Sequence, residues 1–104
     1  SEIGKMTNLR ELSISFTNMH GSIPPEIGQL TLLEFLSLDN NRFRGDLPQE
    51  LENLVNIKYL SITNSESERG AITGPLLDFK NNVNLKELYL NNNQLEGTIP
   101  SSLL

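Results

Sequence analysis

The chain of 104 residues contains no cysteine, which excludes disulfide bonds and thiolate metal sites and leaves the redox compartment open. It also has a single histidine, His20, which stands between Met19 and Gly21. One histidine supplies neither a zinc ligand set nor a histidine pair for acid–base catalysis. The sequence therefore predicts no metal site and no cofactor.

Positive charge and long apolar runs are scarce as well. Eight basic residues stand against thirteen acidic ones, the net charge is −5, and the basic residues form no cluster that would follow a phosphate backbone. No apolar run approaches the roughly 18 residues of a membrane span. Neither a signal-peptide pattern nor an Asn-x-Ser/Thr acceptor site is found. Binding of nucleic acid and direct insertion of this segment into a membrane are therefore not expected.

What the chain does contain is a repeated order of leucine, asparagine, glycine and proline. The clearest copy runs from Leu85 to Pro100, and the same order recurs from Leu9 to Pro24 and from Leu33 to Pro48. Equivalent leucines of successive copies lie 24, 24 and 28 positions apart. These are Leu12, Leu36, Leu60 and Leu88. A period of roughly 20–29 residues with an L-x-x-L-x-L core indicates a leucine-rich repeat solenoid.

Each copy predicts one coil of an α/β repeat solenoid. Residues 11–15, 35–39, 59–63 and 87–91 alternate inward apolar residues with outward ones, which is the periodicity of a strand. Stacked about 4.8 Å apart, these strands form a parallel sheet on the concave face. Glu26 to Leu30 and Gln49 to Leu54 predict short helical turns on the convex face. The expected domain is one array of about four coils, approximately 6–29, 30–53, 54–81 and 82–104.

The pattern L-x-x-L-x-L-x-x-N-x-L-x-G-x-I-P resembles the plant-type leucine-rich repeat of receptor-like kinases, receptor-like proteins and polygalacturonase-inhibitor proteins. The resemblance covers nearly the whole chain. It implies a non-catalytic module at the cell surface or outside the cell that binds a protein or peptide, with room for a kinase domain elsewhere in the parent chain. Because both ends cut through a repeat, we expect an excerpt of a longer array, and its uncapped ends invite self-association.

A turn position follows each strand. An inward asparagine there can hydrogen-bond backbone groups that turn away from the sheet, whereas a hydroxyl does so only in part. These turn residues are Thr17, Asn41, Ser65 and Asn93. Glycines that allow tight backbone geometry come next. They are Gly21, Gly45, Gly74 and Gly97.

The third coil carries five added residues, which fall in the polar segment 65–71. On a functional reading, Glu66, Glu68 and Arg69 form a rim loop that contacts a basic partner. On a structural reading, the charges keep a tolerated insertion solvated. Both readings remain open at this stage.

The outward strand positions form columns across the stacked coils, and they are the candidate ligand-binding surface. Exposed aromatic residues with small polar neighbours are typical of protein-binding surfaces. Alternatively, each aromatic residue only covers its neighbour on the sheet. The candidates on this concave face are Glu11, Phe35, Tyr59, Glu87, Ser37, Ser61, Tyr89, Asp39 and Asn91.

A catalytic carboxylate pair is not evident on this face. Glu11 and Glu87 share a column but lie three coils apart, or about 14 Å, whereas a glycosidase pair needs roughly 5–9.5 Å. Three functions are therefore considered: a receptor array, a soluble defence protein similar to polygalacturonase inhibitors, and a structural array that binds polysaccharide or ice. The aromatic residues count against the third, which would want flat rows without them.

Overall fold

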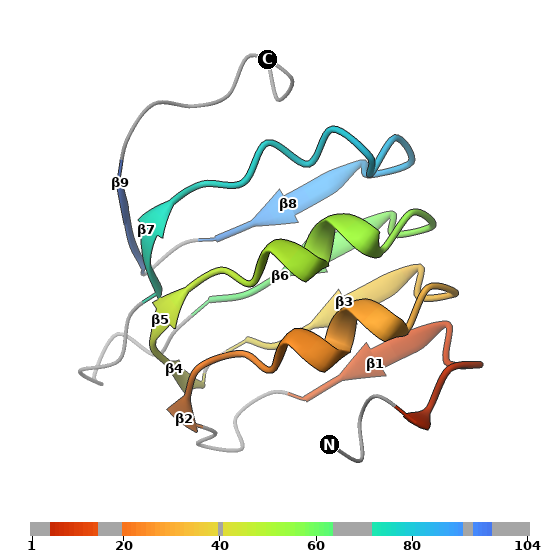
Figure 1. The fold of residues 1–104 in the computed structure, drawn as a ribbon, viewed down its shortest axis with the longest axis horizontal. Helices are drawn as coiled ribbons and strands as arrows, with labels where there is room; N and C mark the ends of the chain where they lie inside the picture. The colour runs from red at the N-terminus through yellow and green to blue at the C-terminus, as the bar shows by residue number, and fades with distance from the viewer. Residues whose placement is uncertain (1–4, 15–19, 40, 64–71, 91–92, 97–104) are drawn as a thin grey trace.

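The computed structural model describes residues 5–14, 20–39, 41–63, 72–90 and 93–96. The chain winds as a coil, and each turn adds one strand to a four-stranded parallel sheet (Figure 1). In spatial order the strands are β1 (Glu11–Ser13), β3 (Phe35–Ser37), β6 (Tyr59–Ser61) and β8 (Glu87–Tyr89). Their central leucines, Leu12, Leu36, Leu60 and Leu88, pair in register. The predicted solenoid, its parallel sheet and its register are confirmed.

Two 3-10 helices lie on the opposite side of the coils from this sheet (Figure 1). They are η2 (Pro25–Gln29) and η3 (Gln49–Asn53), each five residues long. Each follows a proline, Pro24 or Pro48, whose φ of −67° suits the entry to a helical turn. The helical turns that the sequence predicts are therefore present, and they are of the tighter 3-10 type.

A second set of strands lies beside the first and was not predicted. One pair joins β2 (His20–Gly21) to β4 (Arg42–Phe43), and a three-stranded sheet joins β5 (Gly45–Asp46), β7 (Ile72–Pro75) and β9 (Gln94–Glu96). Gly45 and Gly74 have φ values of 81° and 78°, a left-handed backbone that favours glycine. At Gly74 a methyl group would also collide with the carboxylate of Asp46.

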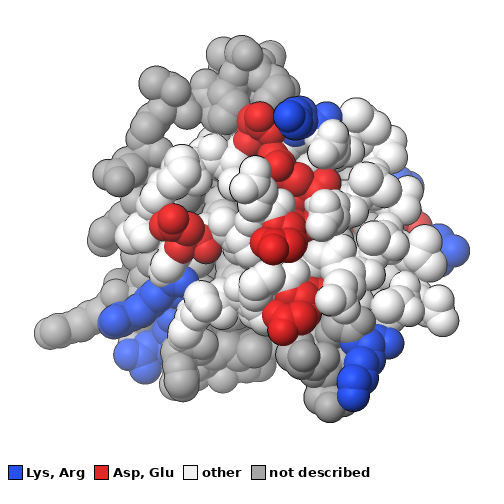
Figure 2. All heavy atoms as spheres, viewed as in Figure 1, with Lys and Arg blue, Asp and Glu red and all other residues white. Residues whose placement is uncertain are grey.

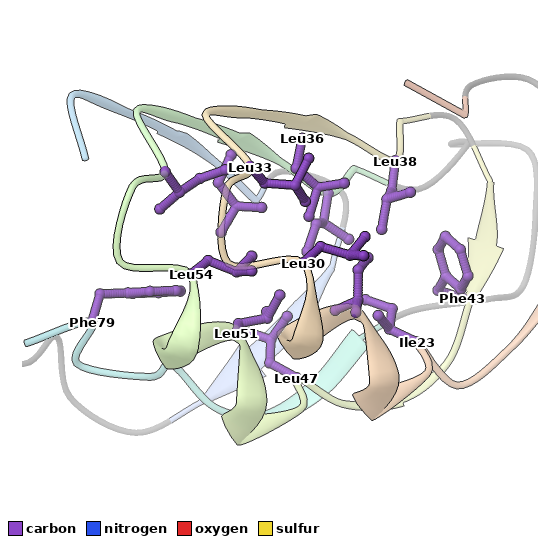
Figure 3. Close-up of a cluster of buried hydrophobic side chains, with 14 of the residues drawn as sticks. Ile23, Leu30, Leu33, Leu36, Leu38, Phe43, Leu47, Leu51, Leu54 and Phe79 are labelled. Atoms are coloured by element: carbon purple, nitrogen blue, oxygen red, sulfur yellow. The ribbon is translucent and has the colours of Figure 1, made fainter. Parts of the chain in front are cut away.

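The hydrophobic core fills the space between the sheet and the helices (Figure 3). Leu33, Leu36 and Leu38 point inward from the sheet side, and Leu30 and Leu54 meet them from the helix side. All five are at most 3% exposed. Burying one such side chain stabilises a fold by about 1.5–3 kcal/mol relative to exposure. Since leucines of the first and last coils are only partly buried, the middle coils hold β3 and β6 most firmly.

The third coil replaces the helical turn by polar contacts. Residues 76–86 contain no helix. Asn82 lies three residues after Phe79, whose φ is 53°. The Asn82 amide nitrogen donates to the carbonyls of Leu51 and Leu54 at 3.2 and 2.9 Å. The Phe79 N–H donates to Glu52 Oε2 at 3.1 Å. These contacts attach the third coil to the second at the position where the first two coils have a 3-10 helix.

Candidate functional site

Three aromatic side chains contact one another on the outer face of the four-stranded sheet. Phe35 and Tyr59 pair in register on neighbouring strands, and their rings stack with centroids 4.5 Å apart and planes 7° apart. Tyr59 also touches Tyr89, with ring centroids 5.6 Å apart and a tilt of 47°. Tyr89 is 42% exposed, while the other two rings are half-buried. We call Phe35, Tyr59 and Tyr89 the aromatic ladder.

Two glutamates flank the aromatic ladder. Glu11 pairs in register with Phe35, and Glu87 pairs with Tyr59. Both side chains are exposed. The Tyr89 hydroxyl donates a hydrogen bond to Glu87 Oε1 at 3.2 Å, and this bond to a carboxylate raises the pKa of Tyr89 because it stabilises the protonated phenol. Across the strands, the order is therefore acidic, aromatic, aromatic, acidic.

The serine column of the same face is not exposed as predicted. Ser37 and Ser61 are only 6% and 2% exposed. Their hydroxyls donate to Asp39, from Ser37 to Oδ2 at 3.1 Å and from Ser61 to Oδ1 at 2.5 Å. The prediction that these two serines offer an outward surface is wrong, because a short side chain beside a carboxylate is drawn into that hydrogen bond. The Asp39 carboxylate is likewise occupied by these hydrogen bonds.

A row of charged residues precedes the strands. The Glu34 carboxylate forms ion pairs with Arg10 Nη1 at 3.0 Å and with Lys58 Nζ at 3.2 Å. Glu34 belongs to the second coil, so these pairs connect it to the first and third coils. The hydrogen bond from Lys58, followed by that from Arg10, lowers the pKa of Glu34. Arg10 and Lys58 therefore already have an acidic partner.

The turn asparagines make the backbone contacts that the sequence predicts. Asn41 is fully buried, and its amide nitrogen donates to the carbonyls of Ile14 and Asp39 at 2.8 and 3.1 Å. The Asn93 amide nitrogen donates to the carbonyl of Ile62 at 2.8 Å, and its oxygen accepts the N–H of Ile72 at 2.9 Å. Each asparagine thereby joins its own turn to the preceding coil.

Some predicted residues lie outside the described part of the chain. They are the turn residues Thr17 and Ser65, the candidate Asn91, the rim residues Glu66, Glu68 and Arg69, and Gly97. Their roles stay predictions. Two groups of concave-face candidates remain in the described part of the chain. One is the aromatic ladder with its two flanking glutamates, and the other is the hydrogen-bonded group of Ser37, Ser61 and Asp39.

A carboxyl pair on the helix side was missed by sequence reasoning. Glu52 is 9% exposed, and burial, followed by its hydrogen bond with Asp78, raises its pKa. The same hydrogen bond lowers the pKa of Asp78. The two neighbouring carboxyls therefore have pKa values shifted in opposite directions, upward for Glu52 and downward for Asp78. The only signal in the sequence was the irregular third coil, in which the usual Ile-Pro is absent and polar residues follow.

Figure 2 views this helix side, where acidic side chains gather over the helices. Those of η2 and η3 are Glu26, Glu50 and Glu52. In the described ranges, no group of three His, Cys, Asp or Glu side chains is arranged to hold a metal ion. The described residues also include no helix long and apolar enough to cross a membrane.

Comparison with known proteins places this geometry in context. The family model described as Leucine Rich Repeat matches residues 8–30, 32–54 and 84–104. A search of curated protein sequences found no match.

Among solved structures, the Arabidopsis receptor kinase HAESA, crystallised with the peptide hormone IDA and the co-receptor SERK1, is 26% identical with a TM-score of 0.86. The alignment covers 96% of this chain and 16% of that one. The plant peptide hormone receptor RGFR1, crystallised with RGF2, is 32% identical with a TM-score of 0.87, covering 98% and 16% of the two chains. A plant ice-binding protein is 33% identical with a TM-score of 0.85, covering 98% and 32%. The chain therefore spans a minor part of each of these proteins.

Proposed function

Because the chain belongs to the leucine-rich repeat family, we propose that it is a non-catalytic ligand-binding array of a receptor-like protein or receptor kinase that recognises a protein or peptide. The observation that carries the proposal is the aromatic ladder on the outer face of the sheet. Aromatic residues are enriched where proteins bind one another and supply much of the binding energy. Two structural neighbours of this chain were crystallised with peptide hormones, which supports the same class of ligand.

The aromatic ladder is also prepared for binding before a ligand arrives. Phe35 and Tyr59 hold each other in a stack, and Tyr89 is held by its hydrogen bond to Glu87. Ordering a free side chain on binding costs about 0.5–1.5 kcal/mol, and much of that cost is already met in the folded chain. The strands beneath are joined by backbone pairing and by the link through Asp39. A rigid, partly apolar face suits recognition better than chemistry.

The test begins with peptides selected from a random displayed library against the wild-type chain. Binding of each peptide is then measured by calorimetry to the wild type and to the double variant Tyr59→Ala/Tyr89→Ala. We expect the double variant to lose at least about tenfold in affinity, because interface aromatics are typical hot spots. Val83→Ala is the matched control, since Val83 is 80% exposed in the turn before β8. Unfolding in urea checks that each variant is folded.

Unchanged affinity in the folded double variant would remove the outer face of the sheet from the proposed function. A soluble inhibitor would carry the same coils, so this experiment supports recognition by either kind of parent protein. Ice binding is checked separately by the growth of ice crystals in solutions of the chain. We expect no inhibition, because this face carries aromatic rings flanked by glutamates in place of a flat polar row.

A further inference from the structure

Among the described residues, one ring face of the aromatic ladder has no aromatic partner. Phe35 and Tyr59 stack nearly parallel, so one face of Phe35 is covered by Tyr59. The other face of Phe35 is turned the opposite way along the sheet, toward β1. The β1 residue in register with Phe35 is Glu11. An exposed carboxylate therefore lies one strand away from Phe35, on the side of the ring that Tyr59 does not cover.

Glu11 and the open face of Phe35 together form a place that attracts a cation. The Glu11 side chain is exposed, and among the described residues it has no hydrogen bond or ion pair. The face of an aromatic ring carries negative potential, and a cation over that face is attracted to it. An arginine guanidinium meets both needs at once, since it stacks on rings and pairs with carboxylates. The nearby Arg10 is held by Glu34 instead.

A second acidic residue, Glu87, lies at the opposite end of the aromatic ladder from Glu11. Glu87 lies two strands beyond Phe35, in register with Tyr59. The Tyr89 hydroxyl occupies only Oε1, and a carboxylate has acceptor sites to spare on its other oxygen. Lys86 comes just before β8, and among the described residues it forms no ion pair with Glu87. Glu87 is therefore open to a cation that approaches over the aromatic ladder.

The distance between the two glutamates sets the distance between two cationic groups of a ligand. Three strand intervals place Glu11 and Glu87 about 14 Å apart. An extended peptide advances about 3.3–3.4 Å per residue, so four residues cover that distance. Residues i and i+4 of an extended segment point to the same side, as does residue i+2 between them. A central apolar side chain would thus meet the ring edges of Phe35 and Tyr59.

We propose, building on the function proposed above, that this face binds an extended peptide segment that crosses the strands and carries two arginines four residues apart. One arginine stacks on Phe35 and pairs with Glu11, and the other pairs with Glu87. The residue midway between them is apolar and packs on the aromatic ladder. The chain's net charge of −5 favours the approach of such a basic segment.

The experiment uses a blocked synthetic peptide with the core Arg-Ser-Leu-Ser-Arg and a twin in which citrulline, a neutral analogue of the same shape, replaces both arginines. Affinities for the full chain are measured by calorimetry at low salt. We expect the twin to bind at least about tenfold more weakly, because hydrogen bonds between charged groups are roughly twice as strong as neutral ones. Glu11→Gln and Glu87→Gln should each weaken binding of the arginine peptide and leave the twin unchanged. Both residues are exposed, so these variants are expected to fold.

Glu50→Gln is the matched control, since it removes one exposed negative charge from η3 on the opposite side of the coil. The proposal is overturned if Glu50→Gln weakens the arginine peptide as much as Glu11→Gln, because general charge attraction then explains binding. It is also overturned if the arginine peptide does not bind, or if the twin binds equally well. Should the twin bind and lose affinity in Tyr59→Ala while Glu11→Gln has no effect, recognition by the aromatic ladder stands and the arginine subsite falls. Binding of cellohexaose in place of both peptides would overturn the subsite and the proposed peptide recognition together.

Discussion

Asp39 and Ser61 join two neighbouring coils through a hydrogen bond of 2.5 Å from the serine hydroxyl to the Asp39 carboxylate. The same Oδ1 accepts the N–H and the hydroxyl of Thr63 at 3.2 and 3.0 Å. Ser37 donates to the other oxygen at 3.1 Å. With four donors from two coils, this carboxylate links the sheet and is not a free group for a ligand.

Replacing Asp39 by alanine should lower the free energy of unfolding by about 2 kcal/mol, because the buried Ser61 hydroxyl loses its charged acceptor. Asp46→Ala is the control, since Asp46 is exposed and, among the described residues, accepts one long bond of 3.4 Å from Thr73. We expect that change to stay within about 0.5 kcal/mol. Urea unfolding followed by circular dichroism measures both. Equal losses in the two variants would contradict the link through Asp39.

Replacing Glu52 by glutamine should stabilise the chain, and more so as the pH rises. The pKa of Glu52 is raised, so its stabilising contribution is complete at a pH below its usual value and is lost as the pH rises through the folded-state value. The pKa of Asp78 is lowered, so its own contribution is lost at acidic pH. Glutamine keeps an N–H donor toward Asp78 and an oxygen for the Phe79 N–H without needing a proton.

Unfolding free energies of the wild type and Glu52→Gln are compared from pH 4 to pH 8, with Glu50→Gln as the exposed control on the same helix. The difference between wild type and Glu52→Gln should widen toward pH 8. A difference that does not change with pH would contradict the raised pKa of Glu52, and a less stable variant at pH 8 would contradict the burial of its charge.

Replacing Gly28 by alanine should destabilise the contact between η2 and η3. Gly28 is buried, and a methyl group there would lie 2.6 Å from the carbonyl oxygen of Glu50. Since backbone cannot move aside as a side chain can, we expect a loss of about 1–3 kcal/mol in the free energy of unfolding. Gln29→Ala is the neighbouring control at an exposed position. Wild-type stability in Gly28→Ala would show that the two helices are not this closely packed.

Replacing Glu87 by glutamine should lower the pKa of Tyr89 toward its usual range. The hydrogen bond to Glu87 is the main cause of the raised value, with the charge of Glu87 next. The chain has two tyrosines and no tryptophan, so ultraviolet titration of tyrosinate reports on few groups. The control Glu11→Gln removes the same charge at the other end of the aromatic ladder. Identical titrations for wild type and Glu87→Gln would contradict the hydrogen bond.

Much of the fold could be predicted from the spacing of the repeats in the sequence. Equivalent leucines 24 positions apart predict strands that pair in register, and Leu12, Leu36 and Leu60 do so. The turn position predicts the buried asparagine, and Asn41 hydrogen-bonds the preceding coil as expected. Such features are predictable because each coil contacts mainly its neighbours, so that one local pattern, repeated, specifies the stack.

The candidate site was predictable only in outline. Alternation along the strands placed Phe35, Tyr59 and Tyr89 on one face, and they do meet there. It also placed Ser37 and Ser61 outward, yet both are buried by their contacts with Asp39. Periodicity assigns a side chain to a face, but its exposure depends on the size and hydrogen bonds of its neighbours.

By itself, the sequence determined the coil, the order of its strands and the residues that turn inward, because these follow from spacing along one chain. Only the tertiary structure decided that Asp39 is a link, that burial and Asp78 raise the pKa of Glu52, and that Phe35 stacks on Tyr59 with Glu11 in register on its other side. These outcomes depend on distances of a few ångströms between side chains on different coils. At that scale hydrogen bonding and burial change the properties of a group, and the repeat pattern does not encode them.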